Sequence, residues 1–201
     1  MRRRVSIFGS TGSIGQNTVD LLVRQGGADA YDVVALTGSS NIALLAEQAK
    51  TLRAQIAVTA DAERGADLAA ALDGTGIETA AGPEALLDAA RRPADWVMSA
   101  IVGAAGLAPG LEAARHCRTL ALANKESLVC AGRLLLDACA EHGTRLLPVD
   151  SEHSAIFQAV QGEDTDRIER LLLTASGGPF RNRSLAEMEQ VTPEEACAHP
   201  T

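Results

Sequence analysis

The sequence predicts an α/β protein built on a Rossmann-like doubly wound parallel sheet. Up to Val149, short β-rich runs alternate with longer Ala- and Leu-rich segments of helical spacing. The short runs are rich in Val, Ile and Leu on both faces, which favours parallel strands covered by helices on either side. A glycine-punctuated turn follows the first run directly, as in folds that bind nucleotides at the start of the first helix.

The expected elements follow one another in regular order along this part of the chain. Strands are expected at residues 5–8, 31–36, 56–58, 77–79, 96–98, 119–122 and 145–149. Helices are expected between them at residues 16–24, 42–52, 62–72, 83–90, 109–116 and 127–141. Pro83 and Pro109 suit the first turn of a helix, where the missing N–H removes no hydrogen bond.

The segment GSTGSIG at residues 9–15 has the layout of a dinucleotide-binding turn between a strand and a helix. Gly9 permits the tight turn, Gly12 lets the backbone approach a pyrophosphate, and Gly15 lets the helix pack closely on the strand. The free N–H groups and positive dipole end of the helix would face the phosphates. A glycine-rich turn of some other α/β protein is the alternative interpretation.

Charge and composition exclude several classes of partner. The net charge of -8 and the aromatic content of 2% argue against a nucleic-acid surface. The four cysteines show no CxxC spacing and indicate free thiols in a reducing compartment. The most apolar later stretch, residues 97–111, is interrupted by glycine and proline and is too short to cross a bilayer. We therefore expect a cytoplasmic protein with neither nucleic acid nor membrane as partner.

The regular alternation ends near Asp150, which predicts one domain at residues 1–149 and a second at residues 150–201. In the second segment we expect a helix at residues 153–160, a strand at residues 168–174 and then a glycine turn. Because a single strand cannot form a stable domain by itself, we interpret this segment as the beginning of an incomplete α+β catalytic domain.

Polar clusters follow three of the expected strands, where parallel α/β sheets bind their ligands. The first is Asn124, Lys125 and Glu126, directly before a helix. A lysine there could hold a phosphate or a reacting oxygen as a compact donor. An ordinary N-cap with a surface ion pair is the alternative.

The second cluster contains Asp150 and Glu152, and the third is the Ser-Gly-Gly run at residues 176–178. On an extended backbone, residues two apart project to one face, so the two carboxylates could bind Mg²⁺ or Mn²⁺ together. The alternative is a helix N-terminus whose acidic residues complement the dipole.

Four motifs, in this order, resemble the 1-deoxy-D-xylulose-5-phosphate reductoisomerase family. They are GSTGSIG at residues 9–15, LANKESLV at 122–129, LLPVDSEHSAIFQ at 146–158 and TASGGPF at 174–180. The resemblance implies a cytoplasmic, homodimeric enzyme of non-mevalonate isoprenoid biosynthesis. Such an enzyme rearranges the sugar phosphate 1-deoxy-D-xylulose 5-phosphate and reduces it to 2-C-methyl-D-erythritol 4-phosphate, using NADPH and Mg²⁺, Mn²⁺ or Co²⁺.

The resemblance also implies a role for each matching residue. NADPH would be bound by Thr11, Gly12, Ser13, Ile14, Asn124 and Glu126. The substrate would be held by Lys125, Ser151, Glu152, Ser176 and His199, and the metal by Asp150 and Glu152. Catalysis would depend on Lys125, Asp150 and Glu152.

Two departures from the family pattern matter. Where the family usually has a basic residue before an asparagine, this chain has Ser39, Ser40 and Asn41. We expect these residues to bind the 2′-phosphate end of NADPH without a countercharge, which leaves the preference over NADH open. The chain also stops at residues 199–201, inside the family's HPNW-like motif. By itself it is expected to bind NADPH weakly or moderately and to turn over negligibly.

Two other functions are compatible with the glycine turn. One is a different nucleotide-dependent oxidoreductase, such as a semialdehyde or homoserine dehydrogenase, which would require a nucleophilic cysteine or another lysine arrangement. The other is a noncatalytic nucleotide-binding module. In such a module, Asp150→Ala and Glu152→Ala would not change the response to Mn²⁺.

Overall fold

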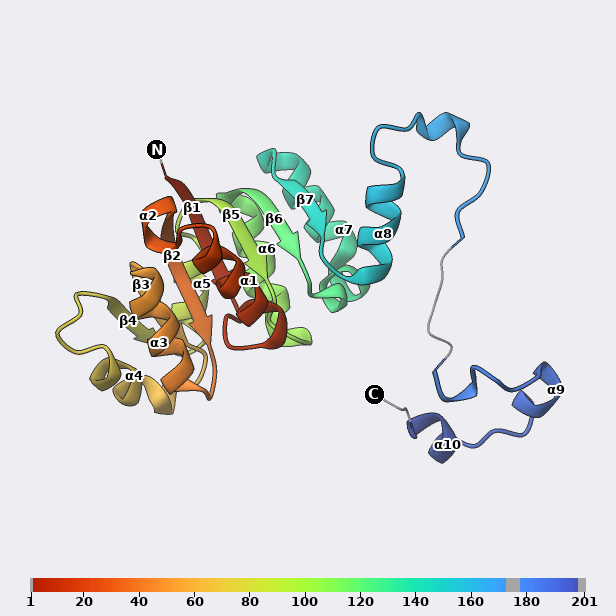
Figure 1. Ribbon diagram of the computed structural model, residues 1–201, viewed down its shortest axis with the longest axis horizontal. Coiled ribbons are helices and arrows are strands. Elements are labelled where there is room, and N and C mark those ends of the chain that lie inside the picture. Colours follow the sequence, from red (N-terminus) through yellow and green to blue (C-terminus); the bar gives the residue numbers. More distant parts are fainter. Residues whose placement is uncertain (1, 173–177, 199–201) are drawn as a thin grey trace. The chain divides into compact units, whose positions relative to one another are not determined.

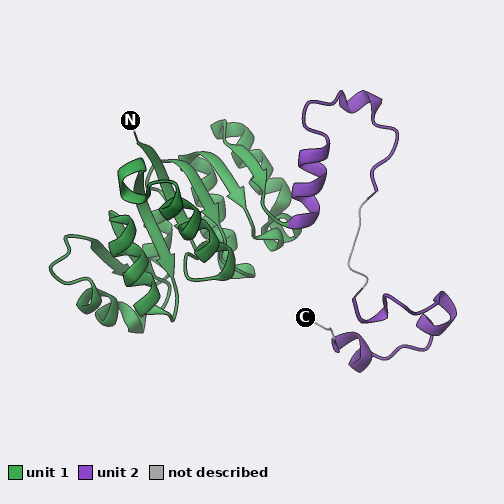
Figure 2. Cartoon of the chain, viewed as in Figure 1, with its two compact units in different colours: residues 1–150 green, residues 151–201 purple. Residues whose placement is uncertain are grey.

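Figure 1 shows the computed structural model, in which residues 2–172 and 178–198 are described. The chain divides into two compact units, residues 1–150 and residues 151–201 (Figure 2).

Unit 1 contains a parallel sheet of seven strands in the order β4-β3-β2-β1-β5-β6-β7. The strands are β1 (Arg3–Phe8), β2 (Tyr31–Gly38), β3 (Ile56–Thr59), β4 (Glu78–Ala81), β5 (Ala94–Ser99), β6 (Cys117–Leu122) and β7 (Arg145–Pro148). The chain builds outward from β1 to β4 and then returns to the other side of β1 (Figure 1). The strand order therefore reverses between β1 and β5, and ligands of such sheets bind beyond the strand ends at this switch point.

Helices cover both faces of this sheet. They are α1 (Ser13–Arg24), α2 (Gly27–Ala30), α3 (Ile42–Leu52), α4 (Gly65–Ala71), α5 (Pro83–Ala90), α6 (Leu107–His116) and α7 (Lys125–His142). One buried apolar cluster joins the sheet to α1, α3 and α4, and a second joins it to α5, α6 and α7. Consecutive residues Ile7 and Phe8 belong to opposite clusters, because successive side chains of a strand point to opposite faces.

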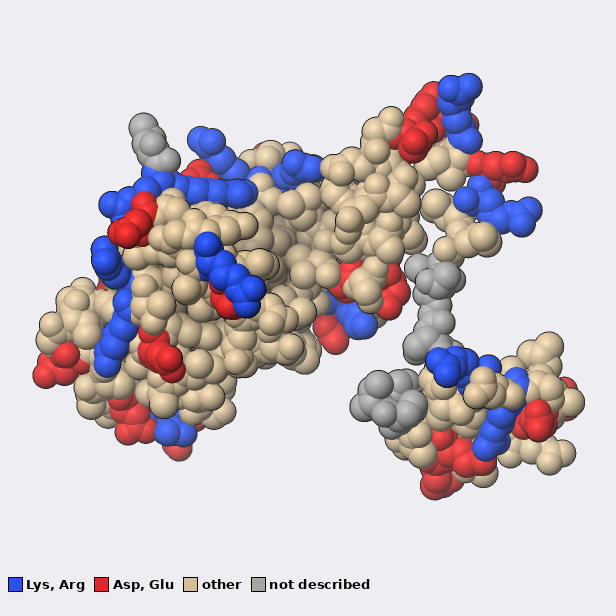
Figure 3. Space-filling model, in the orientation of Figure 1, with Lys and Arg blue, Asp and Glu red and all other residues tan. Residues whose placement is uncertain are grey.

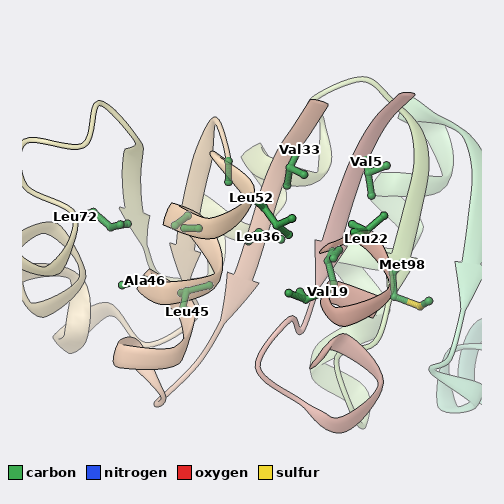
Figure 4. Packing of buried hydrophobic residues seen from close by; sticks show 14 of the residues in the cluster. Val5, Val19, Leu22, Val33, Leu36, Leu45, Ala46, Leu52, Leu72 and Met98 are labelled. Carbon is green, nitrogen blue, oxygen red and sulfur yellow. The ribbon is translucent and has the colours of Figure 1, made fainter. Parts of the chain in front are cut away.

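The first cluster fixes the helices that lie next to the glycine turn (Figure 4). Leu36 of β2 and Leu45 and Leu52 of α3 are fully buried in it. Truncating a buried leucine to alanine typically removes about 2–5 kcal/mol of stability. The position of α3 against the sheet is therefore strongly specified by apolar packing.

All seven expected strands and all six expected helices of this unit are confirmed. The helix expected at residues 62–72 is divided into a 3₁₀ turn η1 (Ala62–Arg64) and α4. The division follows from Asp61, whose side chain accepts a hydrogen bond from the amide of Glu63 and closes a short turn. Two short elements, α2 and the 3₁₀ turn η2 (Ala104–Gly106), were not expected.

Unit 2 contains only short elements among its described residues. They are α8 (Ser151–Ala159), η3 (Thr165–Arg167), η4 (Gly178–Phe180), α9 (Leu185–Met188) and α10 (Pro193–Cys197). The expected helix at 153–160 is confirmed as α8. The strand expected at 168–174 is wrong for residues 168–172, which have no regular secondary structure, and its last two residues lie outside the described ones. Because a strand needs a hydrogen-bonded neighbour, and residues 151–172 and 178–198 contain no other strand, the apolar run has nothing to pair with.

Within the described residues, the helices are all too short or too polar to span a lipid bilayer.

Candidate functional site

The turn between β1 and α1 requires glycine at two positions. Gly9 has φ +86°, and a Cβ atom there would lie 2.7 Å from the carbonyl oxygen of Ala100 in the loop after β5. A Cβ atom at Gly15 would overlap the carbonyl oxygen of Gly9. The first glycine therefore permits the tight turn and the third permits close packing of α1 on it, as the spacing predicts.

The backbone amides of this turn fall into two groups. Those of Gly9 and Ser10 donate to the hydroxyl and carbonyl oxygens of Thr37 in β2, at 3.0 and 2.7 Å. Within the described part of the chain, no acceptor is found for the amides of the open segment that follows. They belong to Thr11, Ser13, Ile14 and Gly15, whereas the amide of Gly12 donates to the carbonyl of Gly9 at 3.1 Å. Because Gly12 caps α1 without a side chain and the first helical turn carries no acidic residue, these donors remain available to an anion.

The segment that follows β2, residues 39–41, lies beside this turn and is exposed. Thr59 of β3 donates its hydroxyl to the carbonyl of Ser39 at 2.8 Å. Asn41 caps α3, since its side-chain oxygen accepts from the amide of Leu44 at 3.1 Å. The hydroxyls of Ser39 and Ser40 are thus available for a ligand, but residues 37–41 include no cation.

The charges on the surface do not form a broad basic patch that could compensate for the lack of a cation at residues 37–41. On the face seen in Figure 3, Lys and Arg groups are interspersed with Asp and Glu groups. The formal net charge of the chain is -8. A phosphate held by residues 37–41 would therefore depend on neutral amide and hydroxyl donors.

Asn124 joins three segments at the carboxyl end of β6. Its side-chain oxygen accepts hydrogen bonds from the amide and hydroxyl of Ser127, both at 2.7 Å, and caps α7. Its side-chain nitrogen donates to the carbonyls of Ile101 and Gly103 in the loop after β5, at 2.5 and 2.8 Å. The residue is 2% exposed. The N-cap interpretation is therefore confirmed for this side chain, and its contact with NADPH stays a prediction.

Lys125 and Asp150 follow the carboxyl ends of neighbouring strands. Leu122 at the end of β6 pairs with Pro148 at the end of β7, and the amide of Val149 donates to the carbonyl of Leu122 at 3.0 Å. Lys125 is exposed. No ion pair of Lys125 is found among the residues that the structure describes, so the surface ion pair of the N-cap interpretation is not observed. Unit 1 therefore brings the glycine turn, the ends of β2 and β6, and Asp150 to one edge of the sheet.

The prediction that Asp150 and Glu152 project to one face of an extended backbone is wrong. It assumed an extended backbone, but α8 begins at Ser151 and Glu152 lies in its first turn. Acidic residues near a helix N-terminus complement the dipole, which is the alternative stated above. The metal role of the pair and the substrate roles of Ser151 and Glu152 therefore depend on the resemblance alone.

Ser176 and His199 lie outside the described residues.

Two of the four cysteines are unsuited to nucleophilic catalysis. Cys117 and Cys139 are buried, and all four thiols are free. Burial, with a smaller contribution from Cys139, raises the pKa of Cys117 to about 12, and burial also raises the pKa of Cys139. Because the thiolate is the nucleophile, neither thiol fits the cysteine-dependent alternative.

Sequence reasoning missed two residues that support the turn. Thr37 binds two of its amides, and Gln48 of α3 donates from its side-chain nitrogen to the carbonyl of Ser10 at 3.0 Å. Gln48 occupies a buried position on an otherwise apolar helix face between Leu45 and Leu52. A polar residue in that periodic pattern is the signal that could have identified it.

A doubly wound sheet with an anion-accepting glycine turn at its switch point defines a dinucleotide-binding α/β protein of the Rossmann class. Family models identify it further. The model described as 1-deoxy-D-xylulose 5-phosphate reductoisomerase matches residues 5–132, and that of the C-terminal domain of the same enzyme matches residues 146–201. The chain belongs to the 1-deoxy-D-xylulose 5-phosphate reductoisomerase family, as the four motifs predict.

Individual relatives agree with this assignment. The reductoisomerase of Ruegeria pomeroyi is 64% identical over 198 residues, which are 98% of this chain and 50% of that protein. The structure of the Zymomonas mobilis enzyme in complex with NADPH matches with a TM-score of 0.90 and 53% identity, covering 100% of this chain and 52% of that one. A further reductoisomerase structure, in complex with NADPH, fosmidomycin and magnesium, matches with a TM-score of 0.79 and 37% identity, covering 98% of this chain and 51% of that one. The chain thus spans about half the length of the curated relatives it matches.

Proposed function

We propose that the whole protein converts 1-deoxy-D-xylulose 5-phosphate to 2-C-methyl-D-erythritol 4-phosphate with NADPH and a divalent cation. In this proposal the chain supplies the coenzyme site and the first metal and substrate ligands. The proposal includes a cytoplasmic location, a homodimer and a small sugar phosphate as substrate.

One observation carries the proposal. The open amides of the glycine turn share the carboxyl edge of the sheet with an exposed lysine, Lys125, and a carboxylate, Asp150, which follow the neighbouring strands β6 and β7. Coenzyme, phosphate-binding cation and acidic group are the components that reduction of a sugar phosphate requires at one place. The related structures in complex with NADPH and with magnesium support the same pairing of ligands.

The coenzyme fits the residues that are present. Thr11, Ser13 and Ile14 would bind the pyrophosphate through their open amides and the adjoining hydroxyls, and Gly12 would let the backbone approach it. Ser39, Ser40 and Asn41 would hold the 2′-phosphate end, and Asn124 and Glu126 would contact the coenzyme further along. NADPH supplies the hydride when bound.

Two of the residues have side-chain donors of the type that a divalent cation needs. Asp150 and Glu152 offer hard carboxylate oxygens, the ligands that Mg²⁺ and Mn²⁺ prefer, and Co²⁺ also accepts them. Residues 2–172 and 178–198 contain no group of three or more potential side-chain ligands. A third ligand would come from elsewhere in the whole protein or from substrate and water oxygens. A divalent cation polarises the oxygens of a bound ketose and stabilises the charge that develops during rearrangement.

The chain's own side chains would do the remaining work at the substrate. Lys125 would donate to a phosphate or reacting oxygen as a compact cation, and Ser151, Glu152, Ser176 and His199 would orient the sugar phosphate. Lys125, Asp150 and Glu152 are the residues on which catalysis would depend.

The test is NADPH oxidation by the whole protein, followed at the nicotinamide absorbance band. We expect oxidation only when 1-deoxy-D-xylulose 5-phosphate and Mn²⁺ are both present, with 2-C-methyl-D-erythritol 4-phosphate identified by NMR. Asp150→Ala and Glu152→Ala should raise the Mn²⁺ concentration needed for half-maximal rate. Equal rates without Mn²⁺, or no oxidation with every component present, would show the proposal to be wrong.

A further inference from the structure

Gln48 carries a polar side chain into the space between α3 and the glycine turn. It is 5% exposed, and its neighbours on the same helix face, Leu45, Ala49 and Leu52, are fully buried apolar residues. Its side-chain nitrogen donates to the carbonyl of Ser10 at 3.0 Å. This long-range bond connects α3 to the turn directly.

The bond completes the fixation of Ser10. The amide of Ser10 donates to the carbonyl of Thr37 at 2.7 Å, and the residue is fully buried. One peptide group is thus held by β2 and the next by α3. The following residue, Thr11, begins the segment whose amides are open to a ligand.

Packing alone does not explain a glutamine at this position. Among the described residues, the side-chain oxygen of Gln48 is buried without a hydrogen-bond partner, and so is the hydroxyl of Ser10. A buried polar atom without a partner destabilises the folded state, whereas an apolar side chain of similar length would not. The amide is explained by the single bond that it makes to the turn.

The same helix also begins at the other end of the proposed coenzyme site. α3 starts at Ile42, directly after Ser39, Ser40 and Asn41. Gln48 therefore ties the helix that follows the 2′-phosphate segment to the turn that would hold the pyrophosphate.

We propose that Gln48 is a positioning residue for the coenzyme. It holds the carbonyl of Ser10 so that the amides of Thr11 and Ser13 stay aimed at the pyrophosphate, at a fixed distance from Ser40. This inference rests on the proposed NADPH site and deepens it.

The test compares Gln48→Met with the unmodified 201-residue chain. Methionine keeps the length of the side chain and removes the donor. Calorimetry with NADPH probes both phosphate positions, and calorimetry with adenosine 2′-monophosphate probes only the 2′ position. We expect the Kd for NADPH to rise about tenfold and that for adenosine 2′-monophosphate to change less than twofold, because one buried hydrogen bond is lost beside the pyrophosphate alone.

Leu52→Ala is the matched control, since it removes buried apolar contacts from the same helix without touching the turn. It should lower the thermal midpoint and leave both Kd values unchanged below that midpoint. Amide hydrogen exchange of residues 9–16 without ligand gives a second readout. In Gln48→Met, the exchange rate of these residues should increase more than that of the rest of the sheet. In Leu52→Ala it should not.

The outcomes separate this inference from the proposed function. Suppose that the unmodified chain binds NADPH. If Gln48→Met then binds NADPH equally well, or if its Kd values for NADPH and adenosine 2′-monophosphate rise by the same factor, Gln48 is only a core residue. If the unmodified chain binds no NADPH, the proposed coenzyme site is wrong, and the exchange of residues 9–16 still decides whether Gln48 holds the turn.

Discussion

Replacing Asn124 by aspartate separates two roles of this side chain. As an N-cap acceptor, aspartate is about as good as asparagine. It has no amide hydrogens, however, so Asn124→Asp leaves the carbonyls of Ile101 and Gly103 without their donor and brings a carboxylate against them. A buried acceptor without a partner costs about 1–3 kcal/mol. With two such acceptors at a site that is 2% exposed, we expect a loss of roughly 2–6 kcal/mol.

Urea denaturation followed by Trp96 fluorescence measures this loss, because the single tryptophan lies in β5, the strand that leads into the loop. Asn41→Asp is the matched control. Asn41 also caps a helix, but it is exposed and its side chain only accepts a bond, so its replacement should change stability by less than about 0.5 kcal/mol. If Asn124→Asp is as stable as Asn41→Asp, the hydrogen bonds from Asn124 to the loop after β5 do not contribute to stability.

Three further experiments, two with substitutions and one with a thiol reagent, test separate parts of the structure. Ser40→Arg should tighten NADPH binding about tenfold and leave NADH binding unchanged, because one charge-assisted bond to the 2′-phosphate is added; an equal change for both coenzymes in calorimetry would contradict the placement of that phosphate. Burial alone would raise the pKa of Glu112, but hydrogen bonds from Arg91 and Arg115 outweigh it and the pKa is lowered. The stabilisation is therefore present above the ordinary carboxyl range and lost as the pH falls through the lowered pKa. Glu112→Gln should be less stable than the unmodified chain by about 1 kcal/mol near neutral pH, with the difference disappearing in acid; a difference independent of pH in urea titrations would refute this. Iodoacetamide at mildly alkaline pH should label the exposed Cys130 and Cys197 and leave the buried Cys117 and Cys139 unmodified, as mass spectrometry of the native chain can show; labelling of all four at similar rates would mean that the two thiols are not buried.

Local signals explain why most of the fold is predictable from the sequence. The helices at residues 42–52 and 83–90 have the expected limits, since Asn41 is an N-cap and Pro83 occupies a first helical turn. The strand expected at 168–174 fails because strand formation depends on a partner elsewhere in the chain. A run of apolar residues does not contain that information.

In the candidate site, too, the roles that depend on local geometry are predictable and those that depend on distant residues are not. The roles of Gly9 and Gly15 follow from backbone sterics within the turn, so their spacing is informative. Asn124 bonds to residues 21 and 23 positions earlier, and Gln48 to one 38 positions earlier. Such partners are set by the packing of strands and helices, and single-sequence patterns do not reveal them. Glu152 shows a related error, because its face depends on where α8 begins.

We place the NADPH site at the carboxyl edge of the unit 1 sheet. Amide hydrogen exchange of the 201-residue chain with and without NADPH tests it most directly. If NADPH binds there, residues 9–16, 37–44 and 122–127 should exchange more slowly in its presence. Protection confined to the cation-lined hollow at the opposite edge, formed by Lys50, Arg53 and Thr75 among others, or no protection at all, would contradict it.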